Sequence, residues 1–160
     1  MDGLTSVRLG MSSEISPRRV PAATDGADFA FSSPRDAKDY FTVRDGHCYA
    51  GTHLIVDLWG GIRLDDIEHI RRALKDAAYA AGATLLDIHL HRFSPNGGVS
   101  GVAVLAESHI SIHTWPERSY AALDLFMCGK AEPYMAIPVM QEAFEPASLC
   151  VGEHLRGRIR

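Results

Sequence analysis

The chain has 160 residues, of which 46% are hydrophobic and 22% are charged, and its formal net charge is -4. This composition is typical of one globular domain and argues against a disordered chain, a collagenous chain or a membrane protein. Charges of both signs are interspersed, so no basic stripe indicates nucleic acid and no polybasic run indicates anionic lipid, and we expect a small-molecule partner.

Targeting signals and cysteine usage point to one compartment. No basic segment followed by an apolar stretch opens the chain, and no apolar run approaches the roughly 18 residues of a membrane span. The three cysteines, Cys48, Cys128 and Cys150, are odd in number and widely spaced, which suits neither a disulfide framework nor a paired-cysteine metal site. We therefore expect reduced thiols, a cytoplasmic protein and no membrane partner.

The first part of the chain differs from the rest. Residues 1–45 are rich in Ser, Pro, Gly and Arg and show no sustained helical or strand period, which predicts a flexible leader before a single domain over 46–160. The alternative is an ordered extension that clasps a partner subunit, because Tyr40, Phe41 and Val43 could dock. The compact part is small, so a homodimer is expected.

The domain is predicted to begin with a strand and a helix. The apolar run His53–Trp59, closed by two glycines, is typical of a strand. A helix should follow, with Asp65 as its cap, Glu68 three residues on and Gly82 as its stop. Its apolar stripe consists of Ile67, Ile70, Leu74, Ala77, Ala78 and Ala81.

Short β-rich runs separated by turn residues dominate the rest of the domain and predict an antiparallel meander. These runs are 84–93, 99–106, 110–115 and 120–127. A second helix is expected within 133–144, where Pro138 cannot lie in the interior without losing a hydrogen bond, so the helix starts late or kinks. Residues 149–155 could form a last strand.

Residues 107–113 concentrate a carboxylate, two hydroxyls and two imidazoles between apolar side chains. The simplest interpretation is an edge strand with one wet face, because polar and less polar residues alternate. The polar series is His109, Ser111, His113 and Trp115.

Two further chemistries would use the same segment. A zinc site needs three or four ligands of this type, although no carboxylate is evident to orient them. Its candidate ligands are His89, His91, His109 and His113. The second alternative is a nucleophilic catalytic triad around Ser108 or Cys128, but neither the nucleophile elbow nor a cysteine-protease signature is present.

Four strings occur in order along the chain. They are His91-Arg92-Phe93-Ser94-Pro95, Val99-Ser100-Gly101-Val102, ESHISIHTWPE from Glu107 to Glu117, and AALDLFMCG from Ala121 to Gly129. Together they resemble the bacterial and archaeal short form of the S-adenosylmethionine decarboxylase family. The resemblance runs from about Gly51 to Arg158 and leaves out the leader.

The resemblance implies a fold and an activity. The expected fold is an α+β two-layer sandwich, an antiparallel sheet with two helices on one face, in a homodimer whose active sites draw residues from both subunits. The expected reaction converts S-adenosylmethionine into CO2 and decarboxylated S-adenosylmethionine, the aminopropyl donor for spermidine-type polyamines.

The resemblance also implies that the chain cuts itself. Ser108 attacks the carbonyl of Glu107, and the chain opens into a β chain of residues 1–107 and an α chain of residues 108–160. Ser108 becomes a pyruvoyl cofactor, which serves as an electron sink for decarboxylation. No metal is implied.

Other residues support these two reactions in the family pattern. Ser100 and His113 assist processing, with His113 as the base, and Cys128 returns a proton to the substrate. Ser108 and His113 differ by five positions, so an ideal strand sends them to opposite faces. We therefore expect a turn or bulge near Ser108 that lets them meet.

Substrate contacts follow from the same pattern. Phe93 and Glu117 match positions that stack on adenine and bond the ribose hydroxyls. Trp115 either lines this pocket or fills the core at a strand end. Residues that could shape the site are Asp57, His109 and Asp124. Cys48 and Cys150 are expected to be small buried hydrophobes, which is the competing role for Cys128 as well.

Two other functions stay open. An ornithine or arginine decarboxylase would carry the same self-processing motif, because the motif builds the cofactor and does not select the substrate. An unprocessed binding or regulatory homologue would have no need of the residues that are all present here, namely Glu107, Ser108, His113 and Cys128.

Overall fold

The structure is a computed structural model that describes residues 41–159, so most of the expected leader lies outside the described residues. The six long strands are β3 (Gly51–Trp59), β4 (Leu85–Arg92), β5 (Val99–Leu105), β6 (Ser108–Trp115), β7 (Tyr120–Cys128) and β8 (Ser148–Arg156). The other elements are the short strands β1 (Thr42–Arg44) and β2 (His47–Tyr49), the helices α1 (Ile67–Ala80) and α2 (Ala136–Phe144), and the 3-10 turns Pro116–Arg118 and Pro133–Met135.

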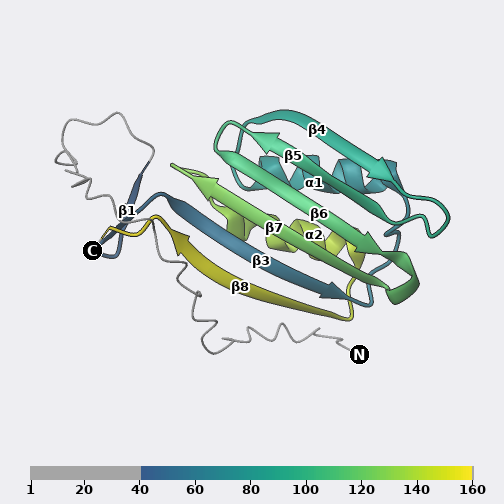
Figure 1. The fold of residues 1–160 in the computed structure, drawn as a ribbon. Helices are drawn as coiled ribbons and strands as arrows, with labels where there is room; N and C mark the ends of the chain where they lie inside the picture. The colour runs from purple at the N-terminus through teal and green to yellow at the C-terminus, as the bar shows by residue number, and fades with distance from the viewer. Residues whose placement is uncertain (1–40, 160) are drawn as a thin grey trace, which may run out of the picture.

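The long strands form one antiparallel sheet in the order β4-β5-β6-β7-β3-β8 (Figure 1). Strands β4 to β7 are consecutive neighbours, which confirms the predicted meander. Strand β3 pairs with β7 on one side and β8 on the other, so the first and last long strands of the domain lie next to each other. The predicted α+β sandwich is confirmed.

Helix α1 starts one residue later than predicted. Asp66, not Asp65, is the N-cap, and its carboxylate accepts a hydrogen bond of 3.0 Å from the backbone N–H of His69. Arg63 donates to the same carboxylate at 2.6 Å, and the Arg63 and His69 hydrogen bonds lower the pKa of Asp66 to about 2. The helix ends as expected, with Gly82 at φ +69°.

Helix α2 begins late, as Pro138 predicts. A 3-10 turn precedes it, and Pro138 lies in its first turn, where a backbone N–H has no partner inside the helix. No helix within residues 41–159 is long and apolar enough to cross a membrane.

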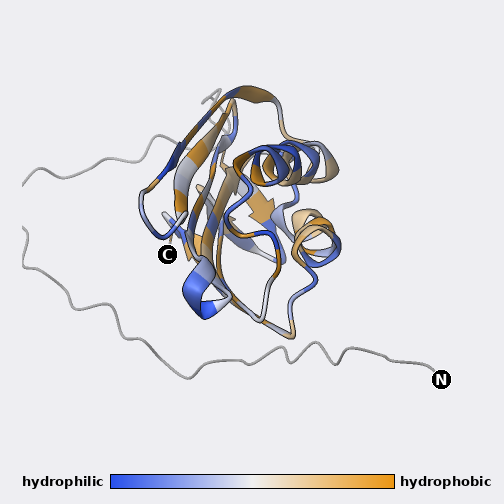
Figure 2. Cartoon of the chain, turned by 90° about the vertical axis from the view of Figure 1, so that its right-hand side faces the viewer, coloured by the Kyte–Doolittle hydropathy of each residue, from blue (hydrophilic) through white to orange (hydrophobic). Residues whose placement is uncertain are grey.

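Both helices pack on the same face of the sheet, as Figure 2 shows. Ile110 and Ile112 of β6 are fully buried in this layer, as are Leu54 of β3 and Leu125 of β7. The alternate residues of each strand project to the opposite face, which no described element covers. We call this second side the open face of the sheet.

Strand β6 lies inside the sheet, paired with β5 and β7 along its length. The expected alternation of His109, Ser111, His113 and Trp115 is present, and these residues lie on the open face. The edge-strand interpretation is wrong, because both edges of β6 are already hydrogen-bonded. The polar side chains of β6 are therefore on a central strand, and only the expected solvent-facing side of the strand is present.

The short β1–β2 hairpin belongs to the folded part of the chain. Thr42 donates a hydrogen bond of 3.0 Å to the carbonyl of Gly129, Arg44 forms an ion pair with Glu132, and Tyr49 is 3% exposed. The strands and contacts that the structure describes therefore include residues before position 46, the boundary suggested by composition.

Candidate active site

The turn between β5 and β6 has unusual backbone geometry. Residues 106–107 form a two-residue connection, because Leu105 pairs directly with Ser108. Ser108, the first residue of β6, has φ +151°, which residues other than glycine rarely adopt. Such a conformation persists only where the surrounding contacts hold it.

The carbonyl oxygen of Glu107 accepts two hydrogen bonds from one residue. The backbone N–H of Cys128 lies 3.1 Å away, and the Cys128 thiol donates over 2.9 Å. The pairing of Ser108 with Met127 brings Cys128, the end of β7, beside the turn. Two donors on one carbonyl oxygen polarise it and can stabilise negative charge that develops there.

A second polar pair lies farther along the same strands. Ser100 and His113 are directly opposite each other in β5 and β6, and the Ser100 hydroxyl lies 2.8 Å from Nδ1 of His113. This hydrogen bond occupies one ring nitrogen and sets the orientation of an exposed imidazole. His113 can therefore accept or release a proton through its other nitrogen.

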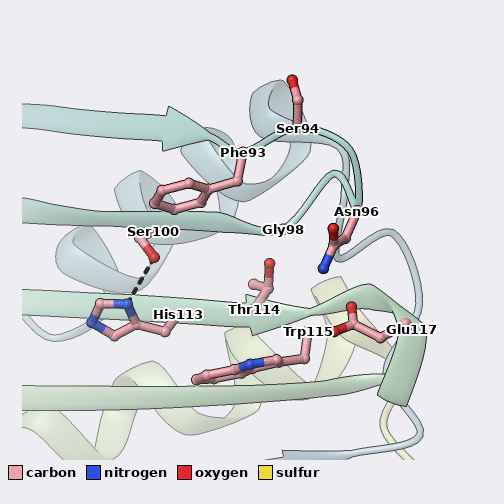
Figure 3. Close-up of a pocket in the computed structure, with 9 residues that line it drawn as sticks. All are labelled: Phe93, Ser94, Asn96, Gly98, Ser100, His113, Thr114, Trp115 and Glu117. Carbon is pink, nitrogen blue, oxygen red and sulfur yellow. Dashed lines mark hydrogen bonds between the residues drawn. The ribbon is translucent and has the colours of Figure 1, made fainter.

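A pocket of about 360 Å³ surrounds this pair (Figure 3). Its lining residues are Phe93, Ser94, Asn96, Gly98, Ser100, His113, Thr114, Trp115 and Glu117. In Figure 3 the Phe93 ring and the Trp115 indole are drawn above and below the Ser100–His113 hydrogen bond. Trp115 is 41% exposed, so it lines the pocket and does not fill the core.

The Trp115 wall of the pocket rests on further aromatic rings. Trp115 lies 5.3 Å from Tyr120, and Tyr120 lies 4.3 Å from Trp59, measured between ring centroids. The Tyr120 hydroxyl donates to Asp57 at 2.6 Å, and this hydrogen bond, with a smaller effect of burial, raises the pKa of Tyr120 to about 12. Asp57 thus supports the pocket through Tyr120.

A polar network lies on the open face around Asp124. One carboxylate oxygen lies 3.2 Å from Nε2 of His53, and the other accepts from the Ser111 hydroxyl at 3.1 Å. Arg156 lies 3.1 Å from Nδ1 of His53. Burial lowers the pKa of His53, and Asp124 opposes that effect. His109, the third shaping candidate, packs edge-on against Phe126 with centroids 6.0 Å apart.

The structure divides the expected site residues into two groups. Glu107, Ser108 and Cys128 meet at the turn, whereas His113 and Ser100 meet at the pocket. The pairing of β6 with β5 and β7 proceeds without a register shift, so Ser108 and His113 lie roughly 16 Å apart at about 3.3 Å per residue. A turn does adjoin Ser108, but it does not bring Ser108 to His113 within one chain.

The histidines of the zinc alternative do not converge. Strand β5 separates His89 and His91 on β4 from His109 and His113 on β6. In the part of the chain that the structure describes, no three His, Cys, Asp or Glu side chains are placed to hold a metal ion. All three cysteines are free, and Cys150 is exposed, so the expectation that it is buried is wrong.

Thr114 is a pocket residue that sequence analysis missed. Its buried hydroxyl donates to the carbonyl of Leu64 at 2.7 Å and accepts from the backbone N–H of Val99 at 2.7 Å. It therefore ties the start of β5 to the segment before α1. A threonine in a strand is ordinary, and no local pattern marks it.

Comparisons with known proteins agree with the sequence resemblance. The sequence model of the family described as S-adenosylmethionine decarboxylase matches residues 52–157. A protein of Thermomicrobium roseum named S-adenosylmethionine decarboxylase proenzyme is 47% identical over 68% of this chain and 95% of its own length. A protein of the same name from Methanococcus maripaludis is 50% identical over 68% of this chain and 91% of its own length.

A solved structure is also similar. The crystal structure of the adenosylmethionine decarboxylase from Aquifex aeolicus has a TM-score of 0.63 and 36% sequence identity to this chain. The similarity covers 70% of this chain and 94% of the other. The antiparallel sheet with two helices therefore matches the fold of that solved structure.

The hydroxyl of Thr114 allows a test of how the pocket is held. Thr114→Val keeps the shape but leaves the N–H of Val99 and the carbonyl of Leu64 unpaired in a buried place, which should lower the free energy of unfolding by about 2 kcal/mol. Thr114→Ser keeps both bonds and should lose about 1 kcal/mol at most. Urea unfolding measures both variants, and equal losses would contradict the role of the hydroxyl.

Proposed function

The chain belongs to the S-adenosylmethionine decarboxylase family, and from that premise we propose that it converts S-adenosylmethionine into decarboxylated S-adenosylmethionine and CO2. The relatives named above carry that activity in their names. The observation that carries the self-processing part of the proposal is the double hydrogen bond from Cys128 to the carbonyl oxygen of Glu107, next to a serine with a strained backbone, whereas the substrate follows from the family. A chain that only binds ligands has no need of such an arrangement.

We propose that this arrangement serves self-cleavage between Glu107 and Ser108. The Ser108 hydroxyl gives its proton to a base as its oxygen bonds to the carbonyl carbon of Glu107, negative charge passes to the carbonyl oxygen, and the two Cys128 donors stabilise it. The bond from that carbon to the Ser108 nitrogen then breaks and the nitrogen takes up the proton from the base, which leaves an ester and a free amine. Loss of the Ser108 α-proton expels the Glu107 carboxylate and opens the chain, and addition of water with release of ammonia leaves a pyruvoyl group.

The residues around the turn suit the formation of this group, because a hydroxyl, a polarised carbonyl and a thiol donor meet there. When formed, a pyruvoyl group supplies an electron sink for the electrons that CO2 leaves behind. Cys128 is the proposed proton donor for the substrate, since its thiol proton is already directed at the junction of Glu107 and Ser108 over 2.9 Å.

The base for cleavage is proposed to come from a second copy of the chain. His113, held by Ser100, lies roughly 16 Å along β6 from Ser108 and cannot act on it within one subunit. The open face between them exposes apolar side chains, with Ile55 at 42% and Val104 at 41%. Two open faces packed about a two-fold axis would place each turn against the partner's pocket.

The pocket suits the nucleoside part of the substrate. Phe93 offers a flat ring for adenine, and Glu117 offers a carboxylate for the two ribose hydroxyls. Trp115 forms a wall of the same pocket and is the third proposed contact. Both aromatic rings are close to half exposed, so they are available to a ligand.

Cleavage is tested by the mass of the denatured protein. The unaltered chain should give two fragments that meet at Glu107 and Ser108, with no free amine on the C-terminal one, and Ser108→Ala should give a single full-length mass. Ser111→Ala is the matched control, because it removes a hydroxyl of β6 that bonds Asp124 away from the turn. Full-length mass for the unaltered chain would contradict self-cleavage.

The substrate is tested by the release of CO2 from S-adenosylmethionine, ornithine and arginine. Only the first should be turned over. Glu117→Gln should raise KM for it about tenfold, because about 1.4 kcal/mol of charge-assisted hydrogen bonding is lost. Glu142→Gln, an exposed carboxylate on α2, serves as the control. Turnover of ornithine or arginine alone would reassign the substrate, and no turnover at all would favour a binding protein.

A shared site is tested by complementation. Ser108→Ala and His113→Ala chains should each stay uncut when expressed alone. Expressed together, they form a mixed dimer in which one site combines Ser108 of the His113→Ala chain with His113 of the Ser108→Ala chain. The His113→Ala chain should therefore be cleaved in each mixed dimer, whereas the Ser108→Ala chain stays uncut. Cleavage fragments are detected by intact mass, and their complete absence from the mixture would place the whole site within one subunit.

A further inference from the structure

Thr84, which lies between α1 and β4, contacts the turn before the proposed cleavage site. Its backbone N–H donates to Oε2 of Glu107 at 2.8 Å, and its hydroxyl donates to Oε1 at 3.1 Å. Its carbonyl accepts from the backbone N–H of Ala106 at 2.9 Å. One residue thus makes three hydrogen bonds to the two residues of the turn.

The end of helix α1 holds Thr84 in place. The backbone N–H of Ala83 donates to the carbonyl of Ala78 at 3.0 Å, and Gly82 adopts φ +69°, as helix ends of this type require. Ala83 is 7% exposed, and the carbonyl of Ala81 accepts from the N–H of Glu132 at 2.9 Å. The hydrogen bonds at the C-terminal end of α1 therefore fix the position of Thr84.

Glu107 is held from two sides. Thr84 binds its carboxylate from the β4 side, and Cys128 binds its carbonyl oxygen from the β7 side. Within residues 41–159 Glu107 forms no ion pair, and its carboxylate accepts the two hydrogen bonds that Thr84 donates. A carbonyl fixed in this way can be attacked without first being ordered.

We propose that Thr84 is a positioning residue for self-cleavage, which acts by holding the Glu107 carboxylate so that the adjoining carbonyl stays between the Cys128 donors and the Ser108 hydroxyl. This inference rests on the proposed function. It assigns the carboxylate of Glu107 a mechanical role, because the carboxylate anchors the residue whose carbonyl is attacked. The strained Ser108 backbone is maintained by the same anchor.

The test is a time course of chain cleavage after cell-free synthesis, followed by gel electrophoresis. Thr84→Val has the shape of threonine without the hydroxyl donor, and cleavage should slow roughly tenfold, which corresponds to about 1.4 kcal/mol on the barrier. Thr84→Ser restores the donor and should cleave at close to the original rate. The unfolding midpoint of each variant, measured with Ser108→Ala to keep the chains uncut, verifies that both fold.

A double-mutant cycle separates positioning from general packing. In a Glu107→Ala chain the carboxylate is already absent, so adding Thr84→Val should slow cleavage no further. Equal slowing by Thr84→Val in both backgrounds would overturn the inference, as would equal rates for the valine and serine variants. If the unaltered chain does not cleave, both the proposed self-cleavage and the role of Thr84 are wrong. If the unaltered chain cleaves and Thr84→Val cleaves equally fast, only the role of Thr84 is wrong.

Discussion

The hydrogen-bonded register of β6 between β5 and β7 is the constraint on which the remaining features depend. Pairing on both edges leaves the strand no freedom to slide or bulge, and a slip of one residue would turn its isoleucines toward solvent. This register sets His113 opposite Ser100 and Ser108 beside Met127. It also brings the carbonyl of Glu107 within reach of Cys128.

The two faces of the sheet carry different tasks. The helix-covered face buries apolar residues and supplies the free energy of folding, whereas the open face carries imidazoles, hydroxyls and carboxylates that a core could not accommodate. The network of Asp124, His53 and Ser111 satisfies polar groups between the two halves of the site.

The helix layer nevertheless contacts the proposed cleavage site. The end of α1 sets Thr84, Thr84 binds the Glu107 carboxylate, and the carbonyl of the same residue is bound by Cys128 at the end of β7. Glu107 is therefore fixed between the connection that follows helix α1 and the end of strand β7. The backbone of Ser108 can keep its positive φ because both residues of the preceding turn, Ala106 and Glu107, are held by hydrogen bonds.

The amino-acid sequence by itself predicts the local secondary structure. Three features depend only on neighbours a few residues apart: the alternation along 109–115, the apolar stripe and glycine stop of α1, and the late start of α2 that Pro138 forces. The four motif strings, in addition, identify the family. The sequence places the cap of α1 one residue too early, because adjacent Asp65 and Asp66 are equally good caps and the Arg63 contact favours the second.

Only the tertiary structure decided which of these residues meet. The insertion of β3 between β7 and β8, the separation of Ser108 from His113, and the contact of Thr84 with Glu107 across 23 positions have no local signal. They arise from strand pairing and helix packing between distant segments. Sequence patterns report on side-chain periodicity within an element, whereas the distances between elements are set by how the whole sheet and its helices pack together.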